Sequence, residues 1–193
     1  MSNTSQKTKK LTVLALLTAI VVVLQALAIS IRFGIFTITL VLAPIIVGAA
    51  LYGCLAGAWL GFVFGVVVVL TDAGPFLAVS VIGTIITCIS KGVLSGLAAG
   101  VVYRLLEKKN SLVASICAGI CAPVVNTGVF LIGCRLFFYD TVAAWGAAVG
   151  FENTALYMIV SFVGVNFLVE LGINLVLSSA IVQIIRAGRR GRN

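Results

Sequence analysis

The sequence predicts an all-α integral membrane protein, a compact bundle of six transmembrane helices with the N- and C-termini on the cytoplasmic side. Three observations lead to this prediction. The 193 residues are 62% hydrophobic and only 9% charged, which is far outside the range of soluble globular domains. The apolar residues form six long runs. Most of the basic residues flank those ends of the runs that would face the same side of the membrane.

Each apolar run is interpreted as one membrane-spanning helix, because most of the runs approach the ~20 residues that a crossing requires. The predicted spans are residues 11–30, 35–52, 55–70, 77–105, 112–138 and 155–185. A transmembrane β-barrel would instead show segments of ~10 residues that alternate apolar and polar side chains. No such alternation is present, so residues 1–193 are expected to form one helical membrane domain.

The first run follows three lysines and could be the apolar region of a signal peptide. Such regions usually contain ~7 to 15 residues. Because this run is closer to twenty residues long, we expect it to remain as a span.

Small residues follow one face of the third and fourth spans. They recur every four residues, at Gly53, Gly57, Gly61, Gly65, Gly92, Gly96 and Gly100. A face without side chains lets two helix backbones approach closely, which in lipid is a main source of association energy. We expect these glycines to serve packing within the chain.

The sequence also indicates where the fifth span begins and ends. Asn110 and Ser111 precede it and are suited to cap the free N–H groups of a helix. Residues 139–154 follow it and form the longest loop, which is long enough to act as a lid.

The basic residues predict the orientation, because cytoplasmic flanks of membrane spans collect Lys and Arg. A bundle with both termini inside places ten basic residues on the cytoplasmic side: Lys7, Lys9, Lys10, Arg104, Lys108, Lys109, Arg186, Arg189, Arg190 and Arg192. Only Arg32 and Arg135 fall outside, and Lys91 lies within a span. This distribution explains the net charge of +8 without nucleic acid as a partner.

Five polar residues lie near the middle of the last three spans. They are Lys91 in the fourth, Asn126 in the fifth, and Asn166, Glu170 and Asn174 in the sixth. An ionisable group at this depth costs at least ~2.5 to 3.5 kcal/mol, so it should face a partner or a wet cavity.

Helical spacing groups these residues into stripes. The three polar residues of the sixth span advance by four and share one face. Thr84, Thr87 and Ser95 lie on the same face as Lys91. We therefore predict a solute site between the last three helices, formed by Lys91, Asn126, Asn166, Glu170, Asn174, Thr84 and Thr87. The alternative is a structural ion pair between Lys91 and Glu170, with the asparagines as interhelical hydrogen-bond partners.

Catalysis is not expected. The chain has no histidine, no Ser or Cys with a recognisable activating partner, no metal-ligand cluster and no glycine loop of the nucleotide-binding type. We predict no catalytic residue, no metal and no cofactor. Any energy input must come from a partner or from an ion gradient.

Four stretches resemble one family. They are "ALLTA" in the first span, "LAPIIVGAALYGCLAGAWLGFVFG" in the second and third, "KGVLSGLAAG" in the fourth and "APVVNTGVFLIG" in the fifth. Their order and the chain length are similar to those of the substrate-binding S components of energy-coupling factor (ECF) transporters.

The resemblance implies a specific role. S components of bacterial cell membranes capture a vitamin or metal from outside, then associate with a transmembrane coupling subunit and two cytoplasmic ATPases. The alanine motif that contacts the coupling subunit in this family corresponds here to Ala15 and Ala19. The metal-binding members use histidine, which this chain lacks.

The resemblance also suggests a cargo. The stretch in the fifth span is similar to a branch that includes pantothenate carriers, and the carboxylate, amide and hydroxyls of pantothenate suit one lysine and several asparagines. A flat ring would require aromatic stacking, which the polar stripes do not offer. Aromatic residues could still reach the site from the loops, namely Phe33, Phe36, Phe76, Trp145 and Phe151.

Two other functions fit the same residues. The chain could be a stand-alone secondary carrier or channel for a small polar solute, in which Glu170 couples transport to a proton gradient. It could also be a structural subunit without a ligand, in which the polar stripes only hold helices together.

Overall fold

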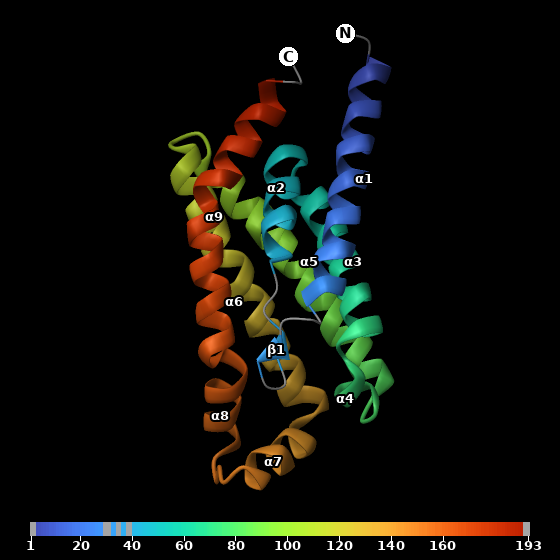
Figure 1. Cartoon of the computed structure of the whole chain (residues 1–193), viewed down its shortest axis with the longest axis vertical. Coiled ribbons are helices and arrows are strands. Elements are labelled where there is room, and N and C mark those ends of the chain that lie inside the picture. Colours follow the sequence, from blue (N-terminus) through green and yellow to red (C-terminus); the bar gives the residue numbers. More distant parts are fainter. Residues whose placement is uncertain (1–2, 29–31, 34–35, 38–39, 191–193) are drawn as a thin grey trace.

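The computed structural model describes residues 3–28, 32–33, 36–37 and 40–190. Within these ranges some side chains lie outside the description, including those of Asn166 and Glu170. The molecule is an elongated bundle of helices with both termini at one end (Figure 1).

Four of the described helices are long and apolar enough to cross a membrane. They are α1 (Asn3–Ala28), α3 (Cys54–Thr71), α5 (Val81–Leu106) and α6 (Ser111–Phe137). These helices confirm the first, third, fourth and fifth predicted spans as helical. The last long helix, α9 (Gly164–Arg190), is reached through the short α8 (Thr154–Tyr157) and a π-helical segment, η1 (Met158–Val163).

The second predicted span, residues 35–52, differs from the prediction. Its helix, α2, covers only Leu42–Tyr52, and the chain before it contains a two-stranded antiparallel pair, β1 (Arg32–Phe33) and β2 (Phe36–Thr37). Pro44 lies in the first turn of α2, where a missing N–H is tolerated. The preceding Ile, Phe and Thr residues favour extended backbone, so the apolar run is not one continuous helix.

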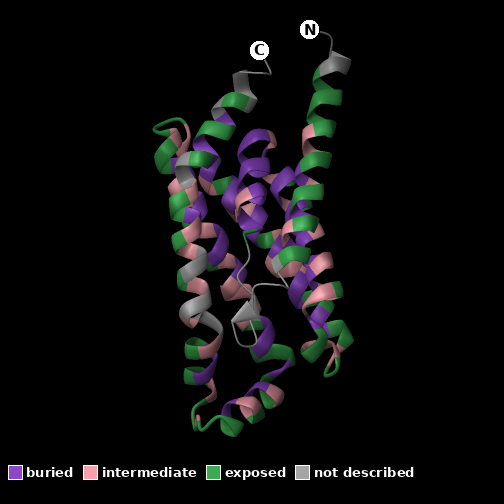
Figure 2. Ribbon diagram, in the orientation of Figure 1, coloured by how far each residue is buried: buried purple, intermediate pink, exposed green. Residues whose placement is uncertain are grey.

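α2 lies at the centre of the bundle and not at its lipid-facing surface. Nine of its 11 residues are buried, and the core of the molecule surrounds it (Figure 2). Ile45 and Ile46 are fully buried there, as is Leu60 of α3. At 1.5 Å per residue α2 is only about 16 Å long, about half the thickness of a bilayer core.

The glycine faces of α3 and α5 pack directly against each other. A Cβ at Gly61 would overlap the carbonyl oxygen of Gly92, and one at Gly57 would overlap that of Gly96. This arrangement confirms the predicted role of these glycines in internal packing. It fixes α5, and with it Lys91, against α3.

Side-chain caps define where the next helices begin. The Asn110 side chain accepts from the backbone N–H groups of Leu112 (2.8 Å) and Val113 (3.4 Å), as predicted, and Ser80 accepts from Gly83 at the start of α5. The predicted outer loop contains a further helix, α7 (Tyr139–Ala148). Together with α4 (Gly74–Leu77), α7 lies at the end of the bundle opposite the termini (Figure 1).

Candidate functional site

Lys91 lies on α5 about 15 Å along the helix axis from Val81, at 1.5 Å per residue. It is partly buried, and its ammonium group contacts two aromatic rings. The Nζ atom is 5.0 Å from the ring centre of Phe130 on α6 and 5.8 Å from that of Phe64 on α3. Cation–π contacts of this kind stabilise a charge that is removed from water.

No described carboxylate lies within ion-pair distance of Lys91. The predicted partner, Glu170, has its backbone in α9, but its side chain lies outside the described residues. The structural ion pair with Glu170 therefore remains untested. The contacts that the structure shows for this ammonium group are with the faces of Phe64 and Phe130.

Two other predicted site residues are buried with unused hydrogen-bonding capacity. Thr87 is 4% exposed and Asn126 is 8% exposed. The hydroxyl of Thr87 and the amide oxygen of Asn126 have no partner among the described residues. Such groups usually cost about 1 to 3 kcal/mol when they are left unsatisfied.

Thr84 has a different environment. It is buried, but its hydroxyl donates to the backbone carbonyl of Ser80 at 2.7 Å. Its donor is therefore used within α5, and only its lone pairs remain for a ligand. Ser95, on the same face of α5, donates to the carbonyl of Ala122 on α6 at 3.1 Å and holds the two helices together.

The sixth predicted span contributes one described site residue. Asn174 on α9 is 2% exposed, so it faces the interior of the bundle as predicted. The side chains of Glu170 and Asn166, one and two helical turns earlier, lie outside the described residues. Their predicted roles remain predictions.

Gln25 is a buried polar residue that the sequence analysis did not single out. It lies near the end of α1, is 1% exposed, and has neither its amide nitrogen nor its amide oxygen paired among the described residues. The signal was present as a lone amide within "IVVVLQALA".

A cluster of aromatic side chains adjoins Lys91 toward the end of the bundle where α4 and α7 lie. Phe76 packs edge-on against Phe130 (5.6 Å), Phe138 (5.0 Å) and Trp145 (5.4 Å between ring centres). Phe130 belongs both to this cluster and to the surroundings of Lys91. Phe76 and Trp145 are two of the loop aromatics that the sequence offered for the site. The polar stripes did not reveal Phe130, because helical spacing on one span cannot reveal rings supplied by neighbouring elements.

The predicted partner residues on α1 lie on its surface. Ala15 and Ala19 are both exposed, and large apolar neighbours such as Leu16 and Val23 are exposed as well. The backbone is accessible at the two alanines because their side chains are small. This face can contact either lipid or another helix.

A family model described as "ECF transporter, substrate-specific component" matches residues 9–182, which is most of the chain and includes every site residue named above. None of the curated proteins matches the chain.

Proposed function

This chain belongs to the substrate-specific components of ECF transporters, and we propose that it captures a water-soluble vitamin bearing a carboxylate, with pantothenate as the first candidate. As a member of this family, the chain is a multi-pass membrane protein that captures a substrate for transport and is not an enzyme. Members of the family pair with a transmembrane coupling subunit and ATPase subunits. We propose that this chain assembles with such subunits and that its substrate is a carboxylate vitamin.

The observation that carries the proposal is the environment of Lys91. Its charge lies close to the rings of Phe64 and Phe130, without a described carboxylate at ion-pair distance. A ligand carboxylate would supply the missing negative charge at a depth where an isolated ion is costly. Hydrogen bonds to charged groups contribute about 1.5 to 3 kcal/mol each, which is enough to favour an acid over its neutral analogue.

Buried polar groups within the bundle suit the rest of such a ligand. The hydroxyl of Thr87 and the amide of Asn126 have unused hydrogen-bonding capacity among the described residues, and so does the amide of Gln25. Pantothenate carries one amide and two hydroxyls that such groups can bind. Asn174 is also buried, and we include it with Asn166, Glu170 and Thr84 in the proposed site.

The aromatic cluster gives the proposed site an apolar side. Phe76, Phe130 and Trp145 offer surface for the methyl groups of pantothenate, and equally for the ring of another vitamin acid. The chemistry common to these candidates is a carboxylate joined to an apolar or aromatic body. For this reason a panel of vitamins must be compared.

The proposed transport cycle places both termini in the cytoplasm of a bacterium and the aromatic end outside. After capture, the exposed surface at Ala15 and Ala19 would contact the coupling subunit, and two cytoplasmic ATPases would drive release inside. In this proposal, substrate capture requires no cofactor.

The test is titration calorimetry on the purified chain. Pantothenate is compared with panthenol, its alcohol analogue without the carboxylate, and with other water-soluble vitamins. We expect one carboxylate vitamin to bind at nanomolar to low micromolar concentration, and its neutral analogue to bind at least about 10-fold more weakly. If a folded preparation bound none of these compounds, or bound acid and alcohol equally, the proposal would be wrong.

A further inference from the structure

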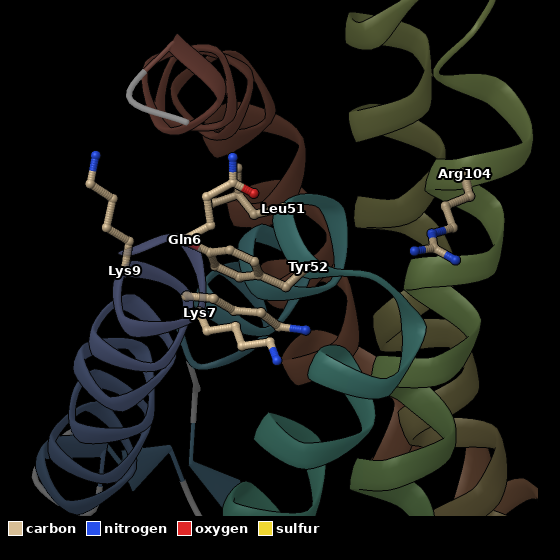
Figure 3. Close-up of a pocket in the computed structure, with 7 residues that line it drawn as sticks. Gln6, Lys7, Lys9, Leu51, Tyr52 and Arg104 are labelled. Carbon is tan, nitrogen blue, oxygen red and sulfur yellow. The ribbon is translucent and has the colours of Figure 1, made fainter. Parts of the chain in front are cut away.

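A second polar site lies at the opposite end of the bundle, far from Lys91. A cavity of about 330 Å³ opens between the first turns of α1, the end of α2 and the end of α5 (Figure 3). Its lining consists of Gln6, Lys7, Lys9, Lys10, Leu51, Tyr52 and Arg104. Four of these seven residues are cations, and no carboxylate is among them.

The cations come from elements that are distant in sequence. The three lysines follow one another on α1, while Arg104 reaches the same cavity from the last turn of α5. Tyr52 lies beside the lysines of α1 (Figure 3), and the ammonium of Lys10 is 6.0 Å from the centre of its ring. Glu107, the acidic residue nearest to Arg104 along the chain, is outside the lining.

The guanidinium of Arg104 lies close to a glycine. Gly53, which joins α2 to α3, has a φ of 95° and lies directly under the guanidinium group. A Cβ at this position would overlap Arg104, and the positive φ would be strained for any other residue. The guanidinium therefore lies beside the α2–α3 junction, and the cavity is lined by residues of three helices, α1, α2 and α5.

Unlike the surroundings of Lys91, this cavity lies where α1 passes from charged to apolar surface. Leu11 follows Lys10 and is 67% exposed, while Leu105 follows Arg104 and is 71% exposed. Basic side chains thus lie directly next to surface that suits acyl chains. Basic pockets at the cytoplasmic ends of membrane helices commonly bind the phosphate of lipid headgroups.

We propose that this cavity binds a phosphate group, supplied by the headgroup of an anionic phospholipid of the cytoplasmic leaflet. Lys7, Lys10 and Arg104 are the phosphate-binding residues, and the guanidinium of Arg104 is suited to a bidentate contact. The bound lipid would attach the start of α1 to α2 and α5. This site is independent of the vitamin and of the residues around Lys91.

The test is native mass spectrometry of the purified chain titrated with phosphatidylglycerol or with phosphatidylcholine. The variant Lys10→Gln/Arg104→Gln is compared with Lys108→Gln/Lys109→Gln. Both variants lose two positive charges, and Lys108 and Lys109 are exposed residues of the α5–α6 connection that do not line the cavity. A third variant, Lys10→Arg/Arg104→Lys, keeps the charge and controls for folding.

We expect the wild-type chain to retain one phosphatidylglycerol in preference to phosphatidylcholine. The cavity variant should bind it about 10- to 30-fold more weakly, as expected for two lost cations near the membrane surface. The Lys108→Gln/Lys109→Gln control should stay close to wild type. The charge-conserving variant should bind more tightly than the cavity variant but more weakly than wild type, because lysine cannot make the bidentate contact of Arg104. Equal losses in the two double glutamine variants would overturn the proposal, because the effect would then be one of total charge.

Inorganic phosphate separates the two sources of the anion. In a further titration it competes with phosphatidylglycerol for the wild-type chain. The proposal predicts that millimolar phosphate leaves the lipid bound, because the acyl chains add affinity. If phosphate displaced the lipid at low millimolar concentration, the cavity would be a site for a free phosphate compound, and the lipid assignment would be wrong.

Discussion

Lys91 and Gln25 show two ways in which a polar side chain is held inside this bundle. The ammonium of Lys91 lies against two aromatic rings, whereas the amide of Gln25 is 1% exposed with both polar atoms unpaired among the described residues. A charge can be stabilised by aromatic rings, but an amide needs hydrogen-bond partners. In the proposed site, ligand groups provide them.

Replacing Gln25 with leucine is therefore expected to have opposite effects on stability and binding. Gln25→Leu should raise the free energy of unfolding of the ligand-free chain by about 1 kcal/mol, because an unsatisfied buried amide is removed. The same change should weaken vitamin binding. Thermal unfolding in detergent, with and without vitamin, measures both effects.

Gln183→Leu is the matched control, because Gln183 is an exposed glutamine on α9. It should leave both quantities nearly unchanged. A Gln25→Leu variant that unfolds more readily and binds normally would mean that Gln25 has a structural partner and no role in the site.

The sequence reveals the polar members of the proposed site more readily than the two aromatic rings nearest to Lys91. Lys91, Asn126 and Thr87 stand out because each interrupts an apolar run. Phe64 and Phe130 do not stand out, because a phenylalanine in a membrane span usually faces lipid or core. Only the packing of α3 and α6 around α5 brings these two rings to Lys91.

The close packing of α3 against α5 depends on glycines that face each other. Gly61 and Gly92 meet backbone to backbone, with no room for a Cβ. Gly61→Ala should destabilise the bundle by about 1 to 3 kcal/mol, as overpacking does in well-packed cores. Because α5 carries Lys91, vitamin affinity should fall as well.

Gly128→Ala provides the comparison for this prediction. Gly128 also lies within a helix, α6, but a Cβ there meets no described atom within 4 Å. Alanine should be tolerated or slightly stabilising at this position, because its helix propensity is higher than that of glycine. Equal thermal stability of the two alanine variants would show that α3 and α5 are not held together in this way.

The exposed alanines of α1 lead to a prediction about association with the coupling subunit. Ala15→Leu and Ala19→Leu should leave folding and vitamin binding unchanged, because both residues are exposed. Both changes should prevent stable association with the coupling subunit by adding bulk at the contact. Co-purification of the chain with that subunit is the measurement, and Val101→Leu, an exposed position on α5, is the control.

Helix α2 shows that hydropathy alone does not predict the length of a helix within an apolar run. Its apolar residues indicate membrane depth, but they do not distinguish a full span from a short central helix. Residues 32–33 and 36–37 form β1 and β2, and nine of the 11 residues of α2 are buried. The glycine periodicity was more informative, because spacing of four has meaning only on a helix.

At the scale of the whole molecule, charge and shape agree with the expected orientation. Both termini and the α5–α6 connection lie at one end, whereas α4 and α7 lie at the other (Figure 1). The orientation relative to the membrane remains a prediction from the basic residues. Accessibility of single cysteines at Lys108 and Asp140 to an impermeant thiol reagent would test it, with only Asp140→Cys labelled from outside.

The partner requirement is also a property of the whole molecule. Reconstituted alone in vesicles, the chain should bind vitamin without accumulating it, and uptake should appear only with the coupling subunit, the ATPases and ATP. The alternative of a secondary carrier predicts uptake by the chain alone. That uptake would depend on a proton gradient and be lost in Glu170→Gln.

The most direct measurement is the affinity of wild type and Lys91→Met for a carboxylate vitamin and its neutral analogue, beginning with pantothenate and panthenol. We predict that wild type prefers the acid, that Lys91→Met weakens acid binding about 10- to 100-fold, and that its preference for the acid disappears. A folded Lys91→Met that bound the acid as tightly as wild type would contradict the account, because Lys91 would then not hold the substrate.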